Sequence, residues 1–412
     1  MQPSIVFFNR SFYPETSAVA QLLTELCDGL VREHGCRVAV IAGYPFVSSD
    51  GHSVCERRGI VKREFFRGIE ILRSRGTTFS KTSFAGRASN YVSYFLSACV
   101  AGLRLSRPDV VVALTDPPVI GLAALAVARR FGARFVFLCQ DVFPEVAQLQ
   151  GNFHSKAVKR ILDWINRFLI RKADWVIAIG ETMGKRLITD KGAEPQKTMV
   201  IHNWADCSAI IPGPKGNAFS EEHGLMSKFV VMHSGNIGMS QGLEIIVQAA
   251  AHLRQYEDIR IVCVGDGVTK PALEERVRAM GLKNILFLPY QPKERLAESF
   301  AAADVFVISL KQGLAGYIVP SKLYGILAAG RPYVAAVEEA CEITAITKQY
   351  NCGLVVEPGD AEDLARKILI LYHDRNLTQR LGANARQAAL KFDRPVQVRA
   401  YYDLFRGLAC AP

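Results

Sequence analysis

Short apolar runs alternate with longer amphipathic segments along the first half of the chain. Runs rich in β-branched and aromatic residues predict strands at 5–8, 37–42, 69–74, 110–114, 134–138 and 175–179. The segments between them repeat apolar residues at helical spacing and predict helices at 18–33, 88–105, 119–131 and 155–172. Continuous apolar strands joined by helices are typical of a parallel sheet that is covered on both faces.

A segment rich in proline and glycine, residues 210–217, predicts a linker, after which the same alternation begins again. Strands are predicted at 229–233, 260–265, 285–288, 305–309 and 333–336, and helices at 243–254, 270–279, 294–302, 321–329 and 361–374. The pattern therefore predicts an α/β protein with two doubly wound domains, residues 1–208 and 209–392. A last helical stretch within 393–412 is expected to return to the first domain. Ligands of such sheets bind beyond the carboxyl ends of the strands, so we expect a cleft between the two halves.

Composition agrees with two soluble domains. The chain has 412 residues, of which 50% are hydrophobic and 22% are charged, and this excludes global disorder. Its ten cysteines are scattered without a CxxC pair, which favours reduced core residues and a cytoplasmic location. The first residues resemble a buried strand and not a signal peptide, and no apolar run is long enough to span a membrane.

The formal net charge of +11 is unevenly distributed. Residues 56–107 contain eleven Lys and Arg but three Glu, so this segment supplies +8. Such an excess predicts an anionic partner, which leaves nucleic acid, a phosphorylated substrate or an acidic membrane surface.

Two features of the second half are suited to binding phosphate. The first strand there leads into a turn of small residues, Ser234, Gly235, Asn236 and Gly238, followed by a helix. This arrangement points backbone amides at an anion, although an ordinary tight turn has the same pattern. Lys322 is predicted in the first turn of a later helix, where a cation without an anionic ligand is unfavourable. A solvated lysine is the alternative there.

In the first half, acidic residues follow predicted strands. Asp141 and Glu145 come after the strand at 134–138 and are candidates for a general base or for charge stabilisation, unless they only cap a helix. Asp116 ends the preceding strand, and Arg10 lies in the loop after the first strand. Both are candidates for side chains that line a ligand site at this edge of the sheet. The alternatives are that Asp116 only forms a turn and that Arg10 is an ordinary surface arginine.

Several common sites are not found in the sequence. Histidines do not cluster with acids at the spacing of metal ligands, and neither GxGxxG nor a P-loop occurs in the right context, so no metal and no cofactor are expected. No recognisable nucleic-acid module accompanies the basic segment, and nucleic acid is therefore not expected as a partner.

The motifs together resemble the family 4 glycosyltransferases, most closely the branch of L-fucosamine transferases that build O-antigens and capsules. The resemblance extends over essentially the whole chain and rests on the segments 115–118, 140–145, 203–206, 234–238, 289–292, 319–325 and 328–332. It implies a GT-B fold of two facing Rossmann-like domains with an interdomain cleft, a nucleotide-sugar donor, and retention of configuration without a metal. The donor would be a UDP-sugar, held mainly by the second domain, and the acceptor a polyprenyl-diphosphate-linked saccharide.

The resemblance also implies individual roles. The Ser234–Gly238 turn would face the donor phosphates and Lys322 would neutralise them. Asp141 would meet the reacting centre. Further donor contacts would come from Tyr290 and Gln291 at the base, and from Gly316, Tyr317, Val319 and Ser321 in the loop beside the sugar.

The chain departs from the family pattern at several positions. Many members carry two glutamates separated by seven residues, where this chain has Tyr317 and Gly325. The arginine and lysine that usually follow the phosphate turn are replaced by Asn236 and Gln241. The missing glutamate pair leaves one alternative to transfer, a catalytically decayed nucleotide-sugar-binding protein. A GT-B nucleotide-sugar epimerase is a second alternative.

The basic segment continues into an apolar stretch, residues 91–103, that is too short to span a bilayer. With Phe65, Phe66, Phe79 and Phe84 nearby, it predicts a peripheral contact with the anionic inner face of the cell membrane. A buried core helix with a solvated basic loop is the alternative.

Overall fold

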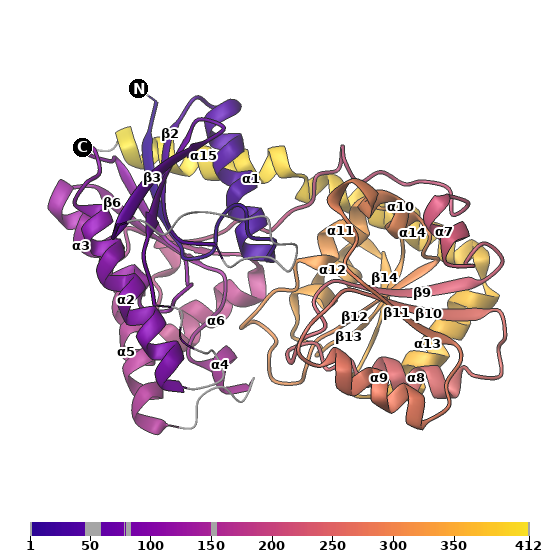
Figure 1. Cartoon of the computed structure of the whole chain (residues 1–412). Coiled ribbons are helices and arrows are strands. Elements are labelled where there is room, and N and C mark those ends of the chain that lie inside the picture. Colours follow the sequence, from indigo (N-terminus) through magenta and orange to yellow (C-terminus); the bar gives the residue numbers. More distant parts are fainter. Residues whose placement is uncertain (1, 46–58, 78, 80–83, 150–154, 411–412) are drawn as a thin grey trace. The chain divides into compact units, whose positions relative to one another are not determined.

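The computed structural model describes all residues except 1, 46–58, 78, 80–83, 150–154 and 411–412 (Figure 1). The chain divides into two compact units. The first comprises residues 1–148, 153–202 and 395–412, and the second comprises 149–152 and 203–394.

The first unit is built on an eight-stranded sheet in the order β3-β4-β2-β1-β5-β6-β7-β8. Its strands are β1 Ser4–Phe8, β2 Arg37–Gly43, β3 Val61–Phe66, β4 Ile69–Ser74, β5 Val110–Ala113, β6 Arg134–Cys139, β7 Trp175–Ala178 and β8 Thr198–Val200. Its helices are α1 Ala18–Arg32, α2 Phe84–Gly102, α3 Ile120–Phe131, α4 Glu145–Leu149, α5 Lys156–Lys172 and α6 Glu181–Lys191. The six predicted strands and four predicted helices are present, with their ends shifted by a few residues.

The sequence predicted a parallel sheet, but the sheet of the first unit also contains one antiparallel strand, β3. It pairs antiparallel with β4 at the edge of the sheet. Its sequence, VKREFF, exposes or half-exposes every residue, so it lacks the continuous apolar run by which the other strands were found. The short strand β8 was missed for the same reason, because none of its three residues is buried.

The second unit contains a six-stranded parallel sheet in the order β11-β10-β9-β12-β13-β14. Its strands are β9 Phe229–Ser234, β10 Ile259–Val264, β11 Ile285–Leu288, β12 Val305–Ser309, β13 Tyr333–Ala336 and β14 Gly353–Val356. Its helices are α7 Ala218–Glu222, α8 Glu244–His252, α9 Lys270–Ala279, α10 Leu296–Ala301, α11 Lys322–Ala328, α12 Glu342–Tyr350, α13 Ala361–His373 and α14 Arg375–Ala389. Figure 1 shows α8 and α9 on one side of these strands and α10 and α11 on the other.

Three elements near the end of the second unit, α12, β14 and α14, were not predicted. Helix α14 is rich in Arg, Gln and Asn, and it buries mainly small residues such as Ala385 and Ala388. Strand β14 has four residues, of which Leu354 and Val355 are half-buried. Weak apolar patterns of this kind do not distinguish an element from a loop.

The segment predicted as a linker is packed onto the second unit. The guanidinium of Arg386 donates to the carbonyl oxygens of Cys207 and Ile210. The guanidinium of Arg331 donates to the carbonyl oxygen of Gly213. The long segment of the second unit accordingly starts at residue 203, whereas the sequence suggested 209.

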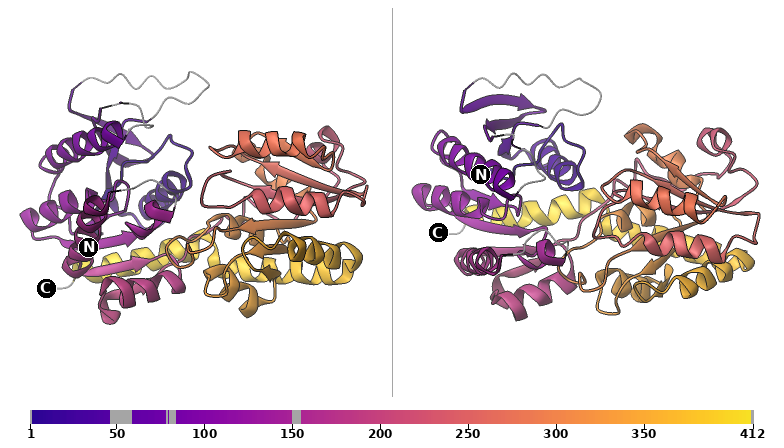
Figure 2. Two further views of the ribbon diagram at one scale, coloured as in Figure 1. Left: turned by 90° about the horizontal axis from the view of Figure 1, so that it is seen from below. Right: turned by 60° about the horizontal axis from the view of Figure 1, so that its bottom comes forward.

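Helix α15, Arg394–Cys410, lies in the first unit from Pro395 onward. Both views in Figure 2 show it, in yellow, beside the strands of that unit. Phe405 packs edge-on against Phe7 of β1, with ring centroids 6.1 Å apart. Val398 lies so close to Gly29 of α1 that a Cβ there would be 2.9 Å from its side chain.

The described cysteines are all free, and seven of the nine are buried. Cys410 is exposed, Cys99 is half-buried, and Cys55 lies outside the described residues. No helix in the described part of the chain is long and apolar enough to cross a membrane.

A buried lysine connects three helices of the first unit. Lys191, at the end of α6, is fully buried, and its Nζ lies 2.7 Å from Glu145 Oε1 on α4 and 2.7 Å from Asp163 Oδ1 on α5. Burial raises the pKa of Asp163, but hydrogen bonds from Lys191 and Arg167 outweigh that effect and hold this pKa below its ordinary value. The three helices therefore share one cation.

Replacing this cation tests its contribution to stability. Lys191→Met is expected to lower the free energy of unfolding by about 3 kcal/mol, because it leaves the half-buried Glu145 without a cation and removes one of the two cations bound to Asp163. Denaturant unfolding measures the change. Lys185→Met, on the exposed side of the same helix, is the control and is expected to change stability by less than about 0.5 kcal/mol. Equal effects of the two substitutions would contradict the assignment.

Candidate functional site

In the second unit, two βα turns pack directly against each other. Gly235 follows β9 with a φ of +128°, and its amide donates to the carbonyl oxygen of Val264 at 2.9 Å. Gly265 and Gly267 follow β10. A Cβ on Gly265 would lie 2.0 Å from the carbonyl oxygen of Gly235, and one on Gly267 would lie 2.3 Å from that of Ile237. Glycine is therefore required at both positions for the turns to approach.

Some backbone amides of the predicted phosphate turn already donate hydrogen bonds to other groups of the chain. The amide of Ile237 donates to the carbonyl oxygen of Asp266 at 2.9 Å, and that of Gly238 donates to Gln241 Oε1 at 3.1 Å. The Asn236 side chain lies beside Gly238, and Ser234 is the buried last residue of β9. The binding of an anion at this turn would therefore depend more on the charge of a side chain than on backbone amides.

Lys322 lies against this turn. Its side chain is half-buried, and its Nζ and Cε are 3.7 and 3.6 Å from the position of a Cβ on Gly235. The same Nζ is 3.2 Å from Nε2 of His233, which is fully buried in β9. The structure thus brings together Lys322 and the end of β9 with its turn, although Lys322 and His233 are 89 residues apart in the chain.

The Lys322–His233 pair contains two basic groups and no carboxylate. Burial lowers the pKa of Lys322 to about 7. Burial and the neighbouring charge of Lys322 hold the pKa of His233 well below its ordinary value, so the imidazole is neutral at neutral pH. A neutral imidazole can accept a hydrogen bond from the lysine ammonium. An anionic ligand would supply the counter-charge that the described residues around Lys322 do not provide.

A loop before α11 is held by an acid that follows β13. The amides of Gly313 and Ala315 donate to Glu338 Oε2, at 2.9 and 3.3 Å. Gly316 has a φ of +78°, and the amide of Tyr317 donates to the carbonyl oxygen of Leu314. Val319 is buried, whereas Ser321 precedes α11 without a hydrogen bond from its side chain to that helix. Glu338 therefore fixes the shape of the loop that was predicted to border a donor sugar.

The two residues predicted at the base of the donor lie after β11. Tyr290 is exposed over 54% of its surface, and its hydroxyl donates to the carbonyl oxygen of Asp266 at 3.3 Å. It thereby adjoins the second glycine turn. The side-chain amide of Gln291 donates to the carbonyl oxygen of Pro289.

In the first unit, Arg10 and Asp116 form an ion pair at the carboxyl edge of the sheet. The guanidinium of Arg10 reaches both carboxylate oxygens of Asp116 at 3.3 Å, and the Ser11 hydroxyl donates to the same carboxylate at 2.7 Å. The backbone amide of Arg10 also donates to the carbonyl oxygen of Asp116. The loop after β1 is thus bonded to the segment after β5.

Asp141 follows β6 at the same edge. Its amide donates to the hydroxyl of Thr115 at 3.3 Å, and the side chain is half-buried. Burial first, and then the nearby charge of Asp116, raise the pKa of Asp141 to about 6. A carboxyl group with this pKa can hold or release a proton near neutral pH.

Glu145, the other acidic candidate, is bound to Lys191 as described above. Its Oε1 accepts from the buried ammonium, and it begins α4. These contacts show a structural attachment for Glu145. Asp141 has no such cation among its described contacts.

Sequence reasoning gave no role to His233, Glu338 or Lys191. His233 lies next to the last residue of the buried strand β9, and Glu338 lies two residues after the buried strand β13. A polar residue near the carboxyl end of a buried strand was the signal that could have found them. Lys191 offered no such signal, because its two carboxylate partners are 46 and 28 residues away in the chain.

Comparison with known families agrees with this arrangement. The profile described as "Glycosyl transferases group 1" matches residues 217–388, and the profile described as "Glycosyl transferase 4-like domain" matches residues 17–204. A curated relative, the probable glycosyltransferase WbjE of Pseudomonas aeruginosa, is 31% identical over 66% of this chain and 68% of its own length. The chain belongs to the group 1 glycosyltransferases.

Two other proteins extend the comparison. The putative colanic acid biosynthesis glycosyl transferase WcaI of Escherichia coli K12 is 27% identical over 64% of this chain and 66% of its own length. The Anabaena protein HepE, solved in complex with UDP-glucose, superimposes with a TM-score of 0.73 and 18% identity over 98% of this glycosyltransferase and 100% of HepE. The fold is GT-B, with one Rossmann-like sheet in each unit.

The protonation of Asp141 in this glycosyltransferase is testable directly. Asp116→Asn is expected to lower the pKa of Asp141 from about 6 toward its ordinary value, because one of the two causes of the shift is removed. Carboxyl carbon NMR titration measures this pKa, and Asp174→Asn serves as a distant control. A pKa that rises or stays constant in Asp116→Asn would contradict the coupling.

The same shift fixes the sign of a stability effect. Because the folded pKa of Asp141 is raised, the folded state binds more protons than the unfolded state between pH 3.8 and about 6. The stabilisation from Asp141 is complete below this window and is lost as the pH rises through it.

Proposed function

We propose that this enzyme transfers a sugar, with retention of configuration and without a metal, from a UDP-linked N-acetylamino sugar to a polyprenyl-diphosphate-linked saccharide. The product would enter a surface polysaccharide. WcaI, a relative, is described as a colanic acid biosynthesis glycosyl transferase, and HepE binds UDP-glucose. The resemblance to the L-fucosamine branch is the basis for the amino sugar.

One observation carries the proposal, and it is the position of the Lys322 amino group. This group lies 3.2 Å from a neutral histidine and against the glycine turn after β9, at the carboxyl edge of a Rossmann-like sheet. Departure of UDP develops negative charge on the diphosphate. A lysine ammonium placed there would stabilise that charge, and preorganised electrostatic stabilisation usually contributes more to catalysis than any other single effect.

The remaining residues of the second unit would position the donor. Tyr290 and Gln291 would border the uracil base, and the loop held by Glu338 would border the sugar. Position 325, where many relatives carry a ribose-binding glutamate, faces other protein atoms here. A Cβ on Gly325 would lie 2.9 Å from the Phe300 ring. The ribose would therefore be bound by another group.

Asp141 would act at the reacting centre from the first unit. Above a pH of about 6 it is a carboxylate, and it would stabilise positive charge developing on the sugar ring. Arg10, held by Asp116, would contact the acceptor or its diphosphate. Glu145 would act indirectly, by tying α4 to Lys191.

Lys322→Met tests the proposal. Loss of one positioned donor to a developing anion typically reduces kcat by about 10²–10³-fold, and a comparable reduction is expected here. Turnover with a UDP-sugar and a lipid-linked acceptor is the measurement, and circular dichroism checks the fold. Lys348→Met, an exposed lysine of the same unit, should retain wild-type turnover. Wild-type turnover in Lys322→Met would refute the role of this lysine.

The same assay separates transfer from its alternatives. A decayed nucleotide-sugar-binding protein would bind UDP without turnover, and an epimerase would convert the UDP-sugar without an acceptor. An acceptor-dependent release of UDP excludes both.

The pH dependence of UDP binding follows from the pKa of Lys322. In the empty enzyme the ammonium is present below about pH 7 and is lost above it, whereas bound diphosphate favours the charged form. The affinity for UDP should therefore decrease above about pH 7, by up to about tenfold per pH unit, with uptake of protons on binding. Calorimetry in two buffers of different ionisation enthalpy measures the uptake. Lys348→Met should take up as many protons as the wild type, and binding without uptake above pH 7 would contradict the prediction.

A further inference from the structure

Helices α2, α3 and α5 form one layer on the first sheet, and the outer side of this layer is unusually apolar. Helix α2 packs on α3, and α3 packs on α5. Helix α2 buries Tyr94, Ala98 and Ala101 toward the sheet. Its opposite side carries three apolar residues with exposed fractions between 36% and 59%, namely Val92, Leu96 and Val100, and Leu103, 67% exposed, follows directly after the helix. Their spacing of three and four residues aligns them in a single stripe.

Helix α5 carries an exposed aromatic group on the side away from its own buried residues. It buries Ile165, Leu169 and Ile170 and leaves Trp164 60% and Ile161 57% exposed. The Trp164 ring stacks on Phe168, with centroids 5.6 Å apart. A surface tryptophan beside exposed aliphatic residues is typical of contacts with the membrane interface.

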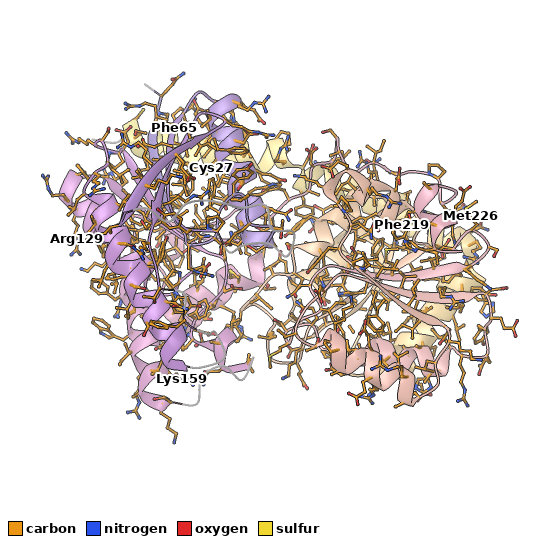
Figure 3. All side chains as sticks on the ribbon, in the orientation of Figure 1. Cys27, Phe65, Arg129, Lys159, Phe219 and Met226 are labelled. Atoms are coloured by element: carbon orange, nitrogen blue, oxygen red, sulfur yellow. The ribbon has the colours of Figure 1, made fainter. Side chains whose placement is uncertain are left out.

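Exposed basic residues lie on α5 and at the end of α3. Helix α5 contains six Lys and Arg and one acid, Asp163, which is bound to Lys191 and Arg167. Lys156, Lys159 and Arg160 are exposed and form no ion pair with a carboxylate of the described residues. Arg129 and Arg130 are exposed at the end of α3, and Figure 3 labels Arg129 and Lys159 on these two helices.

Several basic residues of the segment 56–107 are buried or paired with acids. Arg73 is buried, with its guanidinium bonded to Glu64 and to the carbonyl oxygen of Gly43. Arg63 pairs with Glu70, and Arg67 pairs with Asp28. The Phe66 ring stacks on Tyr13 at 3.7 Å, while Arg57, Arg58 and Lys81 lie outside the described residues, as do the side chains of Phe84 and Arg87. Arg75, Arg104 and Arg107 of this segment are exposed, so exposed basic residues without an ion pair to a described carboxylate lie there as well as on α5.

We infer that the outer side of the α2–α3–α5 layer is a docking surface for an anionic lipid bilayer. Trp164, Ile161 and the α2 stripe would enter the boundary between headgroups and acyl chains, and the basic residues of α5 would contact anionic headgroups. The inference rests on the proposed function only for the purpose of the contact, which would be to bring the enzyme to a lipid-linked acceptor. The contact itself requires only the exposed residues of this layer.

Vesicle flotation of the full-length chain tests the inference. Binding is expected to phosphatidylcholine vesicles that contain phosphatidylglycerol, to weaken as salt is raised, and to be lost on phosphatidylcholine alone. Trp164 also provides a direct signal, because Trp204 is buried and Trp175 is half-buried. Its emission should shift to the blue on binding and should be quenched by lipids brominated in the upper acyl chain.

Matched variants locate the contact. Ile161→Ser with Trp164→Ser, and separately Leu96→Ser with Val100→Ser, are each expected to lower the partition coefficient at least about tenfold. Lys156→Gln with Arg160→Gln should lower it about 30-fold, at roughly fivefold for each charge. Val268→Ser, at an exposed apolar residue of the second unit, and Arg63→Gln, which removes a paired charge, are controls that should bind normally.

The outcomes separate this inference from the proposed function. Absence of binding to anionic vesicles, or binding that the α2 and α5 variants leave unchanged, overturns the docking surface, whether or not the enzyme transfers sugar. Transfer to a detergent-solubilised acceptor reports on the proposed function alone, and the α5 variants should retain it. Loss of transfer with normal flotation would overturn the function and leave the surface standing.

Discussion

The close approach of two glycine turns determines the geometry of the second unit's site. Because Gly265 and Gly267 have no side chains, the turn after β10 lies directly against the carbonyl groups of the turn after β9. That contact leaves Gly235 facing Lys322 and commits most of the turn's amides to partners inside the chain. The positive charge beside Gly235 comes from Lys322, whose Nζ lies 3.2 Å from a neutral histidine, and Lys270 donates to the carbonyl oxygen of Gly265 in the second turn.

The first unit uses the opposite electrostatic arrangement. Two carboxyl groups, Asp116 and Asp141, lie at its carboxyl edge, and only Asp116 has an arginine partner among the described residues. The other nearby acid, Glu145, is paired with a fully buried lysine and belongs to the scaffold. Asp141 thus remains as a proton-carrying group near neutral pH at this edge, and its pKa depends on the charge of its neighbour.

In the first unit, the net charge of a segment does not show how many of its basic side chains are exposed and unpaired. Several of the described arginines in the basic segment are paired with acids or bonded to carbonyl groups, whereas basic residues of α5 are exposed beside a tryptophan. The side of α2 that faces away from the sheet carries a continuous apolar stripe. Such a surface is unfavourable in water unless another apolar phase covers it.

The amino-acid sequence was enough to predict two Rossmann-like sheets and to single out Lys322, Asp141 and Asp116 as candidates. Continuous apolar strands and turn residues are local signals, and residues that follow parallel strands meet at one edge. It did not determine β3, whose alternating pattern gave no apolar run, or the roles of His233 and Lys191. The roles of His233 and Lys191 became visible in the folded protein, because burial and contacts with residues far away in the chain set the charge state of a side chain. The same folding paired Arg63 and Arg67 and left Trp164 exposed.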